Sequence, residues 1–196
     1  MRIIPNGVDF ELFDYQPITN KNVLFIGRFS KDKGIHFLPH VIEQIMCIPD
    51  ATFTAVCPSK TFYGELREIK DAMAGLEQKY KERIKIIHAP QDQEKLRSLY
   101  RDCQVYIQPS RYESFGLCIL EAMATGRPVV ALKVGGIPEV IGDAGFAVNG
   151  KKEFVGAITH LLENRNVCTK IGKKANKRAK KFDWDAIAKQ IISYYG

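Results

Sequence analysis

Short apolar blocks alternate with longer helical stretches along the middle of this 196-residue chain, and this alternation constrains the fold more than any other feature. The blocks are mostly continuous apolar runs, as expected for strands that helices cover on both faces. We expect strands at Val23–Ile26, Phe53–Val56, Ile84–Ile87, Gln104–Ile107, Val129–Ala131 and Phe146–Val148. We expect helices at Ile35–Met46, Tyr63–Tyr80, Gln93–Tyr100, Leu117–Ala124 and Glu153–Leu162, with a short helical turn after Pro138. The alternation predicts an α/β fold, a Rossmann-like doubly wound parallel sheet of about six strands in a single domain.

The two ends of the chain do not belong to this alternation. Residues 1–19 carry a turn signal at Pro5-Asn6-Gly7 and then continue irregularly to the first strand. Residues 165–196 contain two further helical stretches, at Asn166–Lys181 and Trp184–Tyr195. A Rossmann-like sheet needs neither end. We therefore expect residues 1–19 to be an interdomain segment and residues 165–196 to be C-terminal helices, both connecting to a domain that this sequence does not contain.

The composition disfavours several classes of protein. Hydrophobic residues make up 45% of the chain and charged residues 26%, which is ordinary for a soluble globular protein. No apolar run approaches the ~18 residues that a membrane span needs. The five cysteines are scattered and form no CxxC pair, which argues against a disulfide framework and against a zinc site. We therefore expect a cytoplasmic protein in a reducing setting.

The positive charge is concentrated in one stretch. Seven basic residues and no acidic residue lie in Lys170–Lys181, and their number equals the whole net charge of +7. The simplest interpretation is a solvated helix face, with Ile171 and Ala175 turned inward. An anionic membrane is a candidate partner for the same stretch, which would hold the protein at the cytoplasmic face of a membrane. We expect no nucleic-acid partner.

The loop after the first predicted strand carries residues suited to phosphate binding. In open α/β sheets, ligands bind at the carboxyl ends of the strands. Gly27 permits a close approach of the backbone to a ligand, and Arg28 and Lys33 bring two cations to the strand end. A guanidinium and an ammonium together suit a diphosphate. A surface loop with ordinary charges is the alternative for this segment taken alone.

The loop after the fourth predicted strand carries two carboxylates. Gly116 directly precedes the helix predicted at Leu117–Ala124, so the first N–H groups of that helix could bind an anion. Glu113 lies in the loop, and Glu121 sits among apolar residues of the helix, where a carboxylate needs a partner. Ionised carboxylates only accept hydrogen bonds, so the pair indicates recognition of hydroxyl groups. We expect both glutamates to converge on one cleft with Arg28 and Lys33.

These residues belong to an ordered set of motifs. Glu113–Glu121 is a Glu-x7-Glu element, followed by Ala122-Met123-Ala124 and by Gly126-x-Pro128-Val129-Val130-Ala131. The other motifs are Ile3-Ile4-Pro5-Asn6-Gly7-Val8-Asp9, Gly27-Arg28-Phe29 with Lys33-Gly34, Gly135-Gly136-Ile137-Pro138-Glu139-Val140-Ile141, Asp143-Ala144-Gly145 and Phe182-Asp183-Trp184. In this order they resemble the signature of the family 4 retaining glycosyltransferases, whose fold is GT-B. The resemblance covers nearly the whole chain, although Cys118 stands where that family commonly has proline or valine.

The resemblance implies the C-terminal, donor-binding half of a GT-B hexosyltransferase, with a glycan or lipid as acceptor and a place in polysaccharide biosynthesis. It implies that Arg28 and Lys33 hold the diphosphate, that Glu113 binds the transferred sugar and that Glu121 binds the ribose. Arg28, Lys33 and Glu113 would be the catalytic residues. The full donor-binding set implied is Gly27, Arg28, Lys33, Glu113, Phe115, Gly116, Leu117 and Glu121.

The resemblance also implies which small molecule the chain binds and which domain it would need to transfer the sugar. The only small-molecule partner expected is the nucleotide-sugar donor, with no cofactor and no metal. The acceptor site would belong to an N-terminal domain of the same enzyme, which this sequence does not contain. We therefore expect the chain alone to bind a donor without transferring the sugar.

Other motifs carry less weight. His36 and His40 have helical metal-ligand spacing, but Pro39 interrupts them and the sequence shows no third ligand. No Gly-x-Gly-x-x-Gly follows the first strand, so the fingerprint of a dinucleotide fold is missing. A nucleotide-sugar epimerase or phosphorylase shares the architecture, but the Glu-x7-Glu element with Arg28 and Lys33 favours the transferase. The second alternative is a non-catalytic module that binds a nucleotide sugar or an anionic surface.

Overall fold

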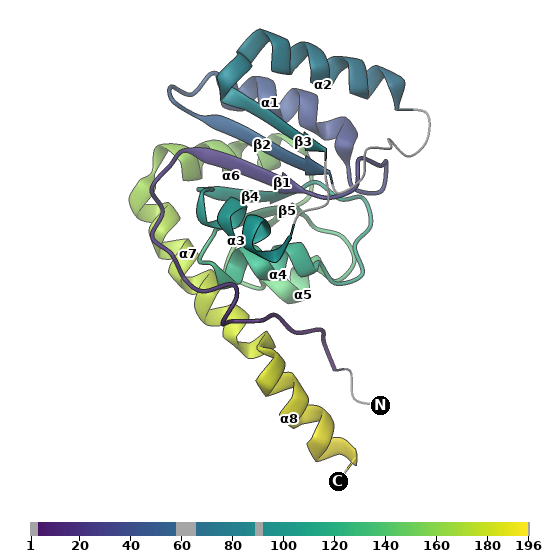
Figure 1. Cartoon of the computed structure of the whole chain (residues 1–196), viewed down its shortest axis with the longest axis vertical. Coiled ribbons are helices and arrows are strands. Elements are labelled where there is room, and N and C mark those ends of the chain that lie inside the picture. Colours follow the sequence, from purple (N-terminus) through teal and green to yellow (C-terminus); the bar gives the residue numbers. More distant parts are fainter. Residues whose placement is uncertain (1–3, 58–65, 89–91, 196) are drawn as a thin grey trace.

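The computed structural model describes residues 4–57, 66–88 and 92–195. In it, six parallel strands form one sheet in the order β3-β2-β1-β4-β5-β6 (Figure 1). Each predicted strand is present, and its ends differ from the prediction by at most one residue. The strands are β1 Asn22–Ile26, β2 Thr52–Cys57, β3 Ile84–His88, β4 Val105–Gln108, β5 Val129–Leu132 and β6 Phe146–Val148. The expected doubly wound parallel sheet is thus confirmed.

The predicted helices are present between the strands and after them. The helix expected from Tyr63 begins at Arg67, and residues 63–65 lie outside the described ranges. The short turn expected after Pro138 is a helix that begins one residue earlier. The helices are α1 Leu38–Met46, α2 Arg67–Tyr80, α3 Gln93–Arg101, α4 Leu117–Ala124, α5 Ile137–Ile141, α6 Lys151–Glu163, α7 Arg165–Ala179 and α8 Trp184–Tyr195.

Helices cover both faces of the sheet, which explains why the strands are apolar without alternation. Successive side chains of a strand point to opposite faces. In β1, Val23 and Phe25 belong to a core shared with α1, α2 and α6. Leu24 belongs to a second core shared with α3, α4 and α5. From β1 the chain adds β2 and then β3 on one side of the sheet. It then crosses back to add β4, β5 and β6 on the other side of β1, so the direction in which strands are added reverses between β1 and β4.

The N-terminal segment, described over residues 4–19, is tied to the rest of the domain by hydrogen bonds. The Val8 N–H donates to the Phe182 carbonyl at 2.7 Å. Asp14 accepts hydrogen bonds from Arg97 at 3.0 Å and from Arg101 at 2.7 Å. Burial opposes ionisation of Asp14, but the hydrogen bonds from the two arginines outweigh that effect and hold its pKa at about 2.

Arg127, within the Gly126-x-Pro128 motif, fixes this segment to the sheet. Its side chain is fully buried and donates to the Gln16 carbonyl at 2.7 Å and to the Cys103 carbonyl at 3.0 Å. Burial lowers the pKa of Arg127. Sequence analysis assigned this arginine no role, because nothing in its neighbours indicates a buried cation.

The basic stretch lies on α7 and on the 3-10 turn Lys180–Phe182 that follows it. Its six lysines are exposed, and Ala175 is buried while Ile171 is half-buried, as the predicted helix face requires. Arg178 differs from the lysines, since it is half-buried and donates to the Val140 carbonyl at 2.7 Å and to the Glu139 carbonyl. This arginine therefore caps α5. Of the exposed lysines, Lys174 pairs with Asp143 at 2.7 Å.

The last helix, α8, projects away from the domain (Figure 1). Ile192 and Tyr194 are 70% and 55% exposed along it. Within the described ranges, no helix has the length and apolar character needed to cross a bilayer.

Candidate functional site

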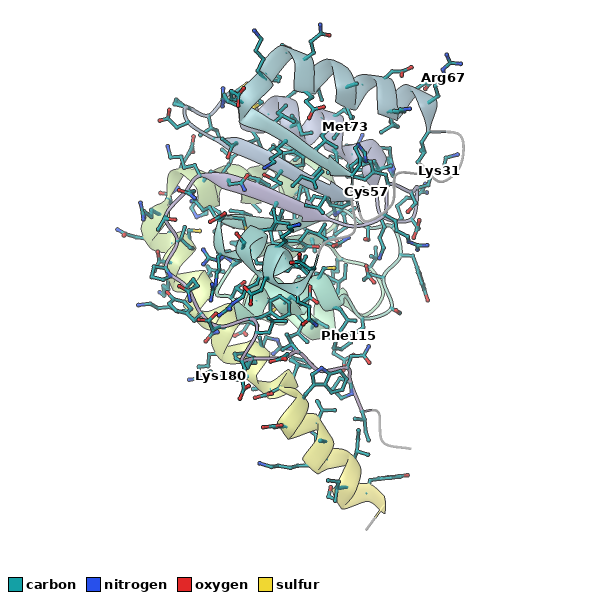
Figure 2. The ribbon with its side chains drawn as sticks, viewed as in Figure 1. Lys31, Cys57, Arg67, Met73, Phe115 and Lys180 are labelled. Carbon is teal, nitrogen blue, oxygen red and sulfur yellow. The ribbon has the colours of Figure 1, made fainter. Side chains whose placement is uncertain are left out.

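The carboxyl ends of β1 and β4 lie side by side where the strand order reverses, the usual ligand position in an open α/β sheet. Residues 27–34 follow β1, and residues 109–116 follow β4. Figure 2 shows Lys31 and Cys57 at this edge, where the arrows of β1 and β2 end. Both loops predicted to carry ligand chemistry therefore meet at one place.

The two loops are locked together by their backbones. Gly34 has φ 71°, a left-handed conformation, and a Cβ atom there would lie 1.8 Å from the Pro109 carbonyl oxygen. The Arg111 N–H donates to the Asp32 carbonyl at 2.8 Å. Only glycine permits both the conformation and the contact at position 34. The Lys33-Gly34 motif thus places the first loop against the second.

A third loop, after β5, also contacts the second. The Gly136 N–H donates to the Glu113 carbonyl at 3.0 Å. A Cβ atom at Gly135 would lie 2.0 Å from the same carbonyl oxygen, and one at Gly136 would lie 2.3 Å from the Ser114 carbonyl oxygen. The Gly135-Gly136 motif therefore fixes the backbone that carries Glu113.

Lys33 and Glu113 form the central contact of the site. The Lys33 Nζ lies 2.6 Å from the Glu113 Oε2, and their side chains are only 20% and 14% exposed. The pair joins residues 80 positions apart. It stands at a cavity of about 230 Å³ lined by Asn6, Ile26, Gly27, Lys33, Gln108, Glu113, Ser114, Phe115, Gly116, Leu117 and Cys118. Six of the eight residues expected to bind the donor line this cavity.

Helix α4 begins at the cavity. Gly116 is its N-cap, with φ 94°, and makes no side-chain cap hydrogen bond. The backbone N–H groups of the first turn can therefore serve a ligand, aided by the positive end of the helix dipole. Phe115 lines the cavity while its ring packs edge-on against Phe182, with ring centres 5.9 Å apart.

Arg28 lies beside the cavity but does not line it. One guanidinium nitrogen is 3.2 Å from Asp32 Oδ2 on the same loop, and both side chains are about half exposed, at 54% and 43%. The nearby Ser30 hydroxyl, together with the charges of Arg28 and Lys33, keeps the pKa of Asp32 below its usual value.

Glu121 lies one turn further along α4 and does not line the cavity. Its Oε2 accepts a hydrogen bond from the Tyr100 hydroxyl at 2.7 Å. Burial raises the pKa of Glu121, and this hydrogen bond works against the rise. Of the four residues expected to converge, the structure therefore brings Lys33 and Glu113 into contact, turns Arg28 toward Asp32 and turns Glu121 toward Tyr100.

Sequence analysis missed the polar groups beneath the cavity. The Tyr106 hydroxyl donates to Gln108 Oε1 at 2.6 Å, and the Gln108 amide donates to Ser110 at 2.7 Å. All three side chains are at most 2% exposed. Tyr106 and Gln108 lie in β4, and Ser110 follows it. Polar residues at the carboxyl end of an otherwise apolar strand are the sequence feature that could have indicated this network.

Cys118, which stands where the resembled family commonly has proline or valine, also lines the cavity. Burial raises the pKa of this thiol to about 12. It is therefore a neutral part of the cavity wall.

A larger groove of about 640 Å³ opens near the amino ends of β1 and β2. Its Arg83 donates to the carbonyls of Met46, Ile48 and Ala51, so this cation serves the backbone. The convergent loops and the helix N-terminus lie at the opposite edge. We therefore assign the candidate site to the smaller cavity. The part of the chain that the structure describes shows no cluster of His, Cys, Asp or Glu that could hold a metal.

A cavity at the switch point of the sheet, beside a helix N-terminus, lies where open α/β domains bind their ligands. The model of the family "Glycosyl transferases group 1" matches residues 20–164. The chain belongs to this family.

A curated relative agrees with this assignment. D-inositol 3-phosphate glycosyltransferase of Corynebacterium efficiens is 32% identical over 185 residues, which cover 91% of this chain and 43% of that protein. The chain thus spans less than half the length of this relative.

Solved structures confirm the fold as the C-terminal half of a GT-B glycosyltransferase. HepE of Anabaena, in complex with UDP and glucose, is 26% identical with a TM-score of 0.82, over 99% of this chain and 56% of that one. The C-terminal domain of the group 1 glycosyl transferase LpcC of Francisella tularensis is 25% identical with a TM-score of 0.74. That match covers 91% of this chain and 100% of that domain.

Proposed function

We propose that this chain is the donor-binding half of a cytoplasmic retaining glycosyltransferase. The enzyme would transfer a hexose from a nucleoside diphosphate sugar to a glycan or lipid acceptor in polysaccharide biosynthesis. The observation that carries the proposal is the Lys33–Glu113 pair, which stands at a cavity beside the N-terminus of α4, at the switch point of the sheet. The UDP and glucose named with HepE make a uridine diphosphate sugar the first donor to test.

Lys33 and Arg28 would bind the diphosphate. Lys33 already lies in the cavity wall, whereas the exposed Arg28 would turn from Asp32 toward the phosphates. Negative charge grows on the diphosphate as the sugar leaves, and two fixed cations stabilise that charge most in the transition state. They would take the place of a metal ion.

The two glutamates would recognise the sugar hydroxyls. Glu113 would accept hydrogen bonds from the transferred hexose, and the N–H groups of Gly116 and Leu117 would meet the sugar or the distal phosphate. Glu121 would accept hydrogen bonds from the ribose. No step requires either carboxylate to form a covalent bond with the sugar.

The chain alone should bind a donor without transferring it. A transferase holds donor and acceptor together in a site that excludes water. Here the cavity holds only about 230 Å³ and lies at the domain edge. The opposite wall and the acceptor site would come from the N-terminal domain of the same enzyme.

Calorimetric titration with UDP-glucose and with ADP- and GDP-glucose tests the proposal. Arg28→Ala and Lys33→Ala should each weaken binding by ~1.5–3 kcal/mol, the usual worth of a hydrogen bond to a charged group. Glu121→Ala should reduce the preference for a nucleoside diphosphate over pyrophosphate. Lys31→Ala is the matched control, since this exposed lysine of the same loop has no proposed contact with the donor (Figure 2). Binding that is indifferent to all three changes, or sugar transfer by the chain alone, would contradict the proposal.

A second proposal concerns the lysines of α7. Their exposed side chains could hold the enzyme at an anionic membrane, at about 1 kcal/mol per basic residue near the surface. Figure 2 shows Lys180 projecting from the domain. This role would suit a lipid acceptor and is compatible with donor binding, because none of these lysines lines the cavity.

A further inference from the structure

Tyr100 is a buried residue with a polar contact to the candidate site. It lies in α3, is fully buried, and its hydroxyl reaches across to α4, 2.7 Å from Glu121 Oε2. The phenol donates and the carboxylate accepts. The flanking residues of Glu121, Leu120 and Ala122, are fully buried and apolar. Tyr100 therefore supplies a specific partner for a carboxylate in apolar surroundings.

Neighbouring rings fix the direction of this phenol. Phe13 packs edge-on against Tyr100, with ring centres 5.8 Å apart, and Tyr106 packs at 5.7 Å on a tilt. The Tyr106 hydroxyl is engaged elsewhere, at 3.2 Å from the Ile26 carbonyl and 2.6 Å from Gln108. Of the two adjacent phenols, Tyr100 is thus the one that contacts Glu121.

We propose that Tyr100 is a positioning residue, which anchors one carboxylate oxygen of Glu121 and leaves the other to accept hydrogen bonds from the ribose. A carboxylate has two oxygens, and the phenol uses Oε2. A side chain held in one rotamer loses less entropy on binding than one that rotates freely. This inference rests on the proposed donor site, since it gives Glu121 the ribose as its ligand.

The electrostatics around the carboxylate support this role. Burial raises the pKa of Glu121, and the Tyr100 hydrogen bond opposes the rise. Burial, Cys118 and Glu121 hold the pKa of Tyr100 well above its usual value, so the phenol stays a donor at every working pH. The other titratable groups facing this cluster are Tyr106 from β4 and Cys118 from α4, both of which have raised pKa values and stay neutral. From the loops, Lys33 and Glu113 act on Cys118 with opposite signs, and they form an ion pair with each other.

Removing the Tyr100 hydroxyl should therefore affect the ribose contact in two ways. The carboxylate of Glu121 loses its anchor, so affinity for the ribose hydroxyls should fall. Its pKa should also rise further, because the effect that opposes burial is gone. As the pH is lowered, Glu121 in the variant would become protonated, and ribose recognition would be lost, at a higher pH than in the wild type.

Calorimetric binding of UDP, 2′,3′-dideoxy-UDP and pyrophosphate tests the inference, with the preference for UDP over dideoxy-UDP as the main measurement. Tyr100→Phe should reduce this preference about three- to tenfold and leave pyrophosphate affinity unchanged. The pH at which the preference is half lost should move upward. Thr54→Val is the matched control, since it removes a buried hydroxyl that contacts Asn22 at the opposite edge of the sheet, away from the cavity, and should keep the preference.

The outcomes separate this inference from the proposed function. A wild type without preference for UDP over dideoxy-UDP overturns the ribose assignment and the inference with it. If Glu121→Gln loses the preference but folded Tyr100→Phe keeps it, the positioning role alone is overturned. An equal fall in UDP and pyrophosphate affinity in Tyr100→Phe has the same consequence. If Tyr100→Phe does not fold, Glu121→Asp gives the same test, because the shorter carboxylate cannot reach both the phenol and the ribose. A full preference in Glu121→Asp would overturn the inference.

Discussion

Replacing Gly34 by alanine tests whether the two site loops depend on one glycine. Gly34 has φ 71°, which costs a residue with a Cβ atom about 1–2 kcal/mol. The new Cβ atom would also lie 1.8 Å from the Pro109 carbonyl oxygen, so the loops must separate. Overpacking of this kind typically costs ~1–3 kcal/mol. We therefore expect Gly34→Ala to lower the free energy of unfolding by ~2–5 kcal/mol.

The same change should weaken donor binding beyond its effect on stability. Lys33 precedes Gly34, and its ammonium lies 2.6 Å from Glu113. Loops that separate carry Lys33 away from this partner and from the cavity. Titration of the folded variant with UDP should therefore show a loss of at least the ~1.5–3 kcal/mol expected for Lys33→Ala.

Gly156→Ala is the matched control for urea unfolding and for UDP titration. Gly156 lies inside α6, and a Cβ atom there would meet nothing within 4 Å. Alanine should stabilise this helix by about 0.5–1 kcal/mol and leave UDP affinity unchanged. The reasoning is refuted if Gly34→Ala matches this control in both stability and affinity.

Three further predictions follow from the charges. Glu113→Gln should tighten UDP binding about two- to tenfold, because Lys33 loses its internal partner. It should also reduce the extra affinity that UDP-glucose has over UDP. Calorimetric affinities for UDP and UDP-glucose equal to those of the wild type would contradict this. Glutamine at Lys170, Lys173 and Lys177 should reduce sedimentation with phosphatidylserine vesicles but not UDP binding, and unchanged sedimentation would count against membrane attachment. Asp14 has a folded pKa of about 2, below its usual 3.8, so its stabilisation is complete above pH ~4 and is lost as pH falls toward 2. Asp14→Asn should therefore cost about 1 kcal/mol at pH 7, given 40% exposure, and urea unfolding should show this gap closing at low pH.

The elements were predictable because each carries its own local signal. Strands covered on both faces are short apolar blocks, and the helix at Leu117–Ala124 begins after a glycine, so its observed bounds match the prediction. The order of the strands was not predictable from such signals. It depends on which side of β1 each connection packs, which only the complete core decides.

The candidate site was predictable in its residue types but not in its contacts. The spacing of Glu113 and Glu121 along the chain carries no sign that the first meets a lysine and the second a tyrosine. Tyr100 resembles any aromatic residue on the inner face of an amphipathic helix. Arg178 resembles its exposed lysine neighbours, yet it caps α5 through backbone carbonyls. In each case the partner comes from a distant segment, and local sequence does not identify it.

The charged side chains of the site share one property that links stability to binding. Lys33 is paired with Glu113, Arg28 with Asp32, and Glu121 is hydrogen-bonded to Tyr100. Each group therefore has a partner in the free protein, which avoids the cost of an unpaired charge in a partly buried place. A donor must replace or extend these contacts, so its affinity is the difference between two sets of similar interactions. A diphosphate offers Lys33 more negative charge than Glu113 does, while the sugar offers Glu113 hydroxyl donors in exchange. Binding of the whole nucleotide sugar thus leaves both partners satisfied, whereas a diphosphate alone leaves Glu113 without its lysine.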